Sequence, residues 1–135
     1  MASKAILSLS LLLAACNTAP QMPPTLTDQA KAYVRNLKLA EVEMKATDSL
    51  MGGQLVEILG KITNNGDRDL KQVDLNCVFY DPYGQVILRQ RSSIVRPKLG
   101  GLKPGETKPF RLPFDTIPQS WNQTMPQMVI AGILF

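Results

Sequence analysis

The chain has 135 residues, which is enough for one domain of ordinary size and too few for two. With 44% hydrophobic and 19% charged residues, the composition is that of a globular protein and excludes disorder over the whole length. The formal net charge is only +4 and the basic residues are scattered, so the sequence predicts no nucleic-acid partner. The absence of histidine removes the commonest general base and the commonest metal ligand.

An apolar run covers residues 5–15 and stops at Cys16. As a helix it would span about half of the ~30 Å hydrocarbon core of a membrane, so it is too short for a stable transmembrane helix. Lys4 precedes the run and small residues end it, an arrangement typical of a secretory signal peptide. We therefore expect residues 1–15 to be removed. The competing interpretation is a buried N-terminal helix with an inert cysteine.

The four residues from Leu13 to Cys16 read Leu-Ala-Ala-Cys and resemble a bacterial lipobox. The resemblance implies that Cys16 is diacylated, that the chain is cut before it, and that the new amino terminus is acylated. Two or three acyl chains would form a stable membrane anchor, because a single chain binds only marginally. Asn17 resembles the second residue of lipoproteins sorted to the outer membrane. The sequence thus predicts a periplasm-facing outer-membrane lipoprotein, with the inner membrane as the less favoured location.

Residues 16–35 are predicted to form the lipidated cysteine and a flexible tether that is rich in proline. Within this region, residues 27–37 could form a short helical turn capped by Thr27 or Asp28. The folded domain is expected to cover residues 36–135.

Apolar and polar residues alternate with a period of two in several stretches after the tether, as half-buried antiparallel strands do. Turn motifs separate these stretches. The alternating stretches are residues 39–46, 55–63 and 74–81, and the turns are NNGDRD (64–69), DPYG (81–84) and KPGE (103–106).

Two further stretches complete the expected sheets. Phe110, Leu112 and Phe114 share one face while Pro109 and Pro113 lie on the other, which predicts an edge strand. Residues 128–135 are apolar throughout, which predicts a strand buried on both sides. Six or seven short strands with regularly spaced turns indicate an all-β fold, an immunoglobulin-like antiparallel β-sandwich.

The stretch from residue 54 to 114 resembles the FxLYD-type family of bacterial lipoprotein domains. Cys77 and Phe79 stand where that family has Phe and Leu, and both remain apolar. The resemblance implies an immunoglobulin-like sandwich and no particular activity. The matching residues are Gly60, Ile62, Asn64, Gly66, Asp67, Val73, Tyr80, Asp81, Gly84, Pro104, Gly105, Glu106 and Phe110.

Candidate catalytic and metal-binding groups are sparse. Cys77 could be a reactive thiol, but its apolar strand face favours a small core residue. The oxygen-rich loop at 64–69 could bind calcium, but its spacing fits a turn with Asx hydrogen bonds better. Glu41 and Glu43 are expected on a solvated face. We therefore predict no catalytic residue, no metal and no cofactor.

Two features could form a partner surface. Trp121 lies in the polar stretch PQSWNQT, where it could be an exposed anchor or could fold back to cap the sandwich. Arg89, Arg91 and Arg96, followed by Lys98, form a basic stripe. The stripe could meet anionic lipid or an acidic partner, or it could protect an edge strand from aggregation.

These observations predict a non-catalytic, lipid-anchored envelope protein that serves as an interaction or assembly module with an envelope protein as its partner. The alternative is a periplasmic carrier or sensor for a small molecule or lipid, suggested by the apolar run at 128–135.

Overall fold

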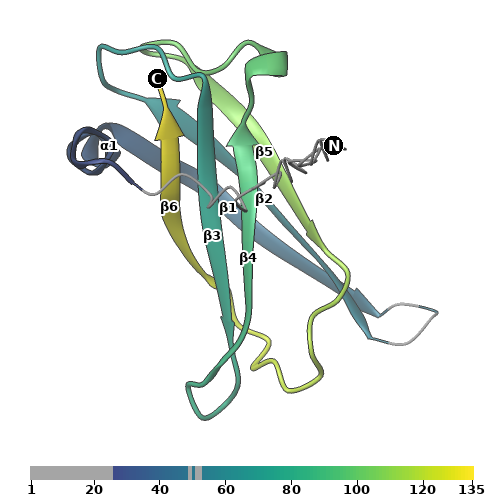
Figure 1. Ribbon diagram of the computed structural model, residues 1–135. Coiled ribbons are helices and arrows are strands. Elements are labelled where there is room, and N and C mark those ends of the chain that lie inside the picture. The colour runs from purple at the N-terminus through teal and green to yellow at the C-terminus, as the bar shows by residue number, and fades with distance from the viewer. Residues whose placement is uncertain (1–25, 49, 51–52) are drawn as a thin grey trace, which may run out of the picture.

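The computed structural model describes residues 26–48, 50 and 53–135 (Figure 1). The expected signal peptide, Cys16 and most of the expected tether lie outside the described residues. The described elements are α1 (Asp28–Tyr33), the 3-10 helix η1 (Val34–Asn36), β1 (Leu37–Asp48), β2 (Gln54–Asn64), β3 (Gln72–Tyr80), β4 (Val86–Val95), the 3-10 helix η2 (Pro97–Leu99), β5 (Thr107–Phe114) and β6 (Gln127–Leu134).

The six strands form two antiparallel sheets with the strand orders β1-β2-β5 and β4-β3-β6. The sheets lie against each other (Figure 1), and their inner faces share one hydrophobic core. Phe79 of β3 meets Phe114 of β5 across the interior, with ring centroids 4.9 Å apart. The predicted all-β antiparallel sandwich is confirmed.

The period-two pattern of the sequence accounts for the core face of β2. Val56, Ile58 and Ile62 are at most 2% exposed, whereas Lys61 on the opposite face is exposed. Gly60 also lies on the inner face, and the ring of Phe110 packs directly over it. A Cβ at position 60 would come within 2.5 Å of that ring.

The two C-terminal strands are both edge strands. The prediction for β5 is confirmed, since it pairs with β2 alone and its prolines cost no hydrogen bond on its free side. The prediction that β6 is buried on both sides is wrong. This strand pairs with β3 alone, and its outward Val129 and Leu134 are 48% and 53% exposed.

The short helix predicted near residue 28 is present and belongs to the domain. Thr27 caps α1, its Oγ1 accepting a hydrogen bond from the Ala30 N–H at 3.2 Å. Ala30 and Tyr33 are 1% and 6% exposed, and Tyr33 is part of the hydrophobic core. The domain therefore begins before residue 36, because burial of Tyr33 holds part of the expected tether against the sandwich.

The amide of Asn64, at the end of β2, joins three separate segments of the chain. Its Oδ1 accepts hydrogen bonds from the Tyr33 hydroxyl at 2.7 Å and from the Gly66 N–H at 3.0 Å. Its Nδ2 donates to the carbonyls of Arg68 and Leu102 at 2.8 and 3.2 Å. The amide is fully buried, so its loss would leave several polar groups without partners.

We predict that Asn64→Ala lowers the free energy of unfolding by about 3 kcal/mol, because buried hydrogen-bond partners are left unsatisfied. The neighbouring Asn65 is exposed, so Asn65→Ala is the matched control and should change stability by less than about 0.5 kcal/mol. Urea unfolding followed by circular dichroism measures both values. Equal destabilisation by the two substitutions would contradict the role assigned to the buried amide.

Candidate interaction surface

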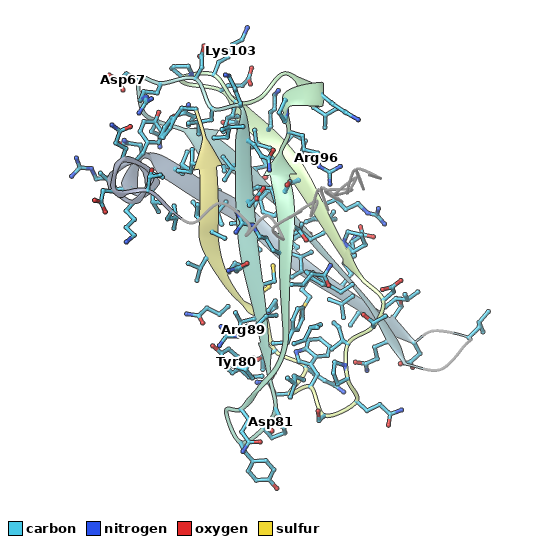
Figure 2. All side chains as sticks on the ribbon, viewed as in Figure 1. Asp67, Tyr80, Asp81, Arg89, Arg96 and Lys103 are labelled. Carbon is cyan, nitrogen blue, oxygen red and sulfur yellow. The ribbon has the colours of Figure 1, made fainter. Side chains whose placement is uncertain are left out.

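The predicted basic stripe does not form one patch. Arg89 and Arg96 are exposed, and within the described part of the chain neither forms an ion pair. Arg96 lies seven positions after Arg89, which is about 23 Å along an extended strand. Figure 2 shows Arg96 toward one end of β4 and Arg89 toward the other. A compact partner would therefore meet one of these arginines rather than both.

Arg91 lies between them and is held by Asp74 of β3. Its Nη2 and Nε lie 2.9 and 3.0 Å from Asp74 Oδ2. Asp74 Oδ1 accepts further hydrogen bonds from Ser93 Oγ at 2.6 Å and from Gln72 Nε2 at 3.0 Å. Arg91 thus neutralises the charge of a buried carboxylate. In this it differs from Arg89 and Arg96, which form no ion pair among the described residues.

The same contacts set the pKa of Asp74. Burial alone would raise the pKa of this carboxyl, but the hydrogen bonds from Ser93, Gln72 and Arg91, with the positive charge of Arg91, outweigh it. The pKa therefore lies below its ordinary value of 3.8. The carboxylate stays ionised within a largely protein-lined site because its partners favour the charged form.

Of the two alternatives left open for Trp121, the structure confirms the one in which it folds back to cap the sandwich, and the exposed anchor is excluded. Trp121 is only 5% exposed and packs edge-on against Phe79, with centroids 5.9 Å apart. Its Nε1–H donates to the Thr124 carbonyl at 3.2 Å. The loop between β5 and β6 folds back over the end of the sandwich, because burying the indole removes a large apolar area from water.

The remaining candidate groups take structural positions. Cys77 is fully buried, and burial raises the pKa of its thiol to about 11, so the reactive thiolate is strongly disfavoured. The Gly66 N–H bonded to Asn64 Oδ1 is an Asx turn, as the loop sequence predicts. Glu41 forms an exposed ion pair with Lys61 at 2.9 Å.

The turn between β3 and β4 presents an aromatic side chain that the sequence analysis did not select. Tyr83 is 89% exposed. Asp81 Oδ1 accepts hydrogen bonds from the Tyr83 and Gln85 N–H groups at 2.9 and 2.8 Å, and Gly84 supplies the positive φ of 79°. The Asp-Pro-Tyr-Gly motif predicts this turn. It does not predict the exposure of Tyr83, which arises because no other described segment covers the side chain.

The residues beside this turn extend the exposed surface. Val86 is 42% exposed and pairs with Tyr80, whose hydroxyl donates to Gln127 Oε1 at 2.8 Å. Arg89 follows on β4, and Figure 2 shows Tyr80, Asp81 and Arg89 at the same end of the sheet. We call Tyr80, Tyr83, Val86 and Arg89 the turn surface. It combines aromatic, aliphatic and cationic groups on a braced hairpin, a composition that favours protein contacts.

Hollows beside β2 and β5, beside β3 and β6, and between loops lie outside the space between the two sheets. One hollow of about 380 Å³ is lined by loop residues that include Leu70, Pro97 and Lys103.

No described helix has the length and apolar character needed to cross a membrane.

Comparison of the chain with protein-family models, with curated proteins and with solved structures gave no match. The class established here is therefore the one that the strands define, a β-sandwich of two three-stranded antiparallel sheets.

We predict that Asp74→Asn is less stable than the wild type by about 1–3 kcal/mol at pH 7, because Arg91 loses its ionic partner. The folded pKa of Asp74 lies below that of the unfolded chain. The ionised Asp74 therefore contributes to the free energy of unfolding above about pH 4, and this contribution is lost as the pH falls through the folded pKa. The stability difference between the two proteins should narrow over that range.

Urea unfolding at a series of pH values between 7 and 2.5 measures this difference. Asp67→Asn, at an exposed loop position labelled in Figure 2, is the control and should track the wild type. A difference between Asp74→Asn and wild type that stays constant down to the lowest pH would refute the assignment.

Proposed function

We propose that this protein is a lipid-anchored bacterial envelope protein, of the FxLYD-type class that its sequence resembles, and that it binds a protein partner through the turn surface. The observation that carries the proposal is Tyr83, 89% exposed on a turn braced by Asp81. A side chain presented by a rigid turn loses little backbone freedom on binding, so more of its contact energy is retained. Tyrosine is also among the residues that dominate interface energies.

The chemistry of the turn surface defines the partner. Tyr83 and Val86 offer apolar contact, and Arg89, with no ion pair in the described chain, offers a positive charge. An apolar protein surface that carries a carboxylate would complement these groups. The turn surface also lies at the opposite end of the domain from α1, as Figure 1 shows for α1 and the β3–β4 turn. A tether that joins the domain at α1 leaves this surface free.

The rival function, a carrier of a small molecule or lipid, receives less support. The space between the sheets is occupied by side chains of both, with Phe79 in contact with Phe114 and Trp121. A ligand held there would have to displace part of the packed core, at a cost of several kcal/mol.

The anchor is tested by fractionation of the cells that produce the protein. Wild type should sediment with membranes, and Cys16→Ser should not, because the thiol that carries the diacylglycerol is lost. Cys77→Ala is the matched cysteine control and should remain with membranes, since Cys77 is buried in the core. If Cys16→Ser sediments with membranes as fully as the wild type, the lipid-anchor proposal fails.

The partner surface is tested by replacing Tyr83 with a photo-cross-linking phenylalanine analogue in the anchored protein and irradiating intact cells. We expect one dominant adduct to an envelope protein. The matched control places the same analogue at Leu99, which is 73% exposed but lies in η2, after the far end of β4. An identical set of adducts from both positions, or none from position 83, would contradict binding through the turn surface.

A further inference from the structure

The four edge strands of the sandwich are protected to different degrees. β1 carries Glu41, Glu43 and other charges, and a bulge interrupts its pairing with β2. β5 contains Pro109 and Pro113. β4 carries Arg89 and Arg91. Charges, prolines and bulges on an edge all oppose pairing with another strand.

The fourth edge, β6, has no charged residue and no proline along its eight residues, QMVIAGIL. It lies at the end of its sheet and pairs only with β3 among the described strands (Figure 1). Its outward Val129 and Leu134 are about half exposed. A neutral, apolar edge strand of this length is a template for addition of a further strand.

We propose that β6 pairs with β6 of a second copy of this chain, in antiparallel orientation, and so joins two three-stranded sheets into one of six strands. In an antiparallel pair of two identical strands, like charges near the middle of the strand come to lie close together, which destabilises the pair. Arg89 and Arg91, near the middle of β4, would meet this penalty, whereas β6 has no charge to meet it. Neutrality therefore favours a second copy over a charged partner at this edge.

The bulge in β6 makes full overlap of the two strands possible. Against β3, Ile130 and Gly132 oppose the consecutive residues Leu75 and Asp74, so Ala131 is the extra residue. Because of this extra residue, the side chains at the two ends of β6 point to the same face of the sheet. The outward residues are Gln127, Val129, Gly132 and Leu134, opposite the outward residues of β3.

An antiparallel pair matches residues that lie on the same face. With the two copies of β6 fully overlapped, Gln127 lies opposite Leu134 and Val129 opposite Gly132. In a regular strand of eight residues the first and last side chains point to opposite faces. Full overlap of two such strands would therefore place outward residues opposite inward ones. A hollow of about 110 Å³ beside Gly132, lined also by Gln72 and Leu134, leaves room for the opposing Val129 side chain.

The inference goes beyond the proposed function, because β6 and the turn surface are separate places and either interaction could exist without the other. An eight-residue strand pair is smaller than a standard protein interface. We therefore expect a dissociation constant on the order of micromolar.

Sedimentation equilibrium of the full chain, in a density-matched detergent, tests the dimer. Val129→Lys should raise the dissociation constant about tenfold or more, because a charge on the edge opposes pairing. Leu55→Lys places the same charge at a similarly exposed aliphatic residue of β2, in the other sheet, and should leave the constant unchanged. A monomeric wild type at several hundred micromolar, or equal effects of the two substitutions, would overturn the proposal.

A second measurement fixes the register and does not depend on how Val129→Lys folds. In chains that carry Cys16→Ser, Gln127→Cys and Leu134→Cys are prepared separately, both at exposed positions. Opposed residues in an antiparallel pair have the Cα separation that a disulfide requires. Oxidation of an equimolar mixture should give the mixed disulfide in clear excess over either homodimer. A statistical mixture, or no disulfide, would overturn the register and with it the proposed pair.

Discussion

The buried amide of Asn64 is the interaction on which the arrangement of this domain depends. Asn64 is the last residue of β2. Its side chain accepts a hydrogen bond from the Tyr33 hydroxyl of the N-terminal helix and donates hydrogen bonds to two loop carbonyls from later in the chain. Tyr33 in turn packs edge-on against Phe135, with centroids 5.4 Å apart, and Arg68 lies 3.6 Å above the Phe135 ring. No buried side-chain nitrogen or oxygen of the described residues lacks a partner. One satisfied amide thus joins the first helix to two loops and, through Tyr33, to the C-terminal Phe135, and removing it would leave costly unpaired groups.

With that end of the sandwich fixed, the opposite end is stabilised by different chemistry. Trp121 and Phe79 form an aromatic contact under the loop that precedes β6, while Asp81 braces the β3–β4 turn from within. The apolar ring is therefore buried and the amphipathic Tyr83 is left outside. This division explains why the turn surface can be rigid and exposed together, since its support lies in hydrogen bonds to its own backbone rather than in cover from other segments.

The strands and turns could be predicted from sequence because their causes are local. Period-two alternation identified β2, Asp-Pro-Tyr-Gly identified the turn at 81–84, and the two prolines identified β5 as an edge. The errors concern residues whose environment is set by distant segments. Arg91 is held by Asp74, which the alternation of β3 gave no reason to expect as its partner. The apolar run of β6 resembles a central strand, and only the strand order reveals that one side of it is an edge. Tyr83 was within a predicted turn, but its exposure followed from the path of other loops.

The strand pair proposed for β6 has a consequence for the proposed N-terminal anchor. An antiparallel pair within one continuous sheet has its twofold axis perpendicular to the sheet, so the α1 ends of the two copies point in opposite directions. Asp28, the first residue of α1, lies twelve positions after Cys16, and a segment of that length reaches up to about 40 Å when extended. Both copies could therefore attach to one membrane while the joined sheet lies along it.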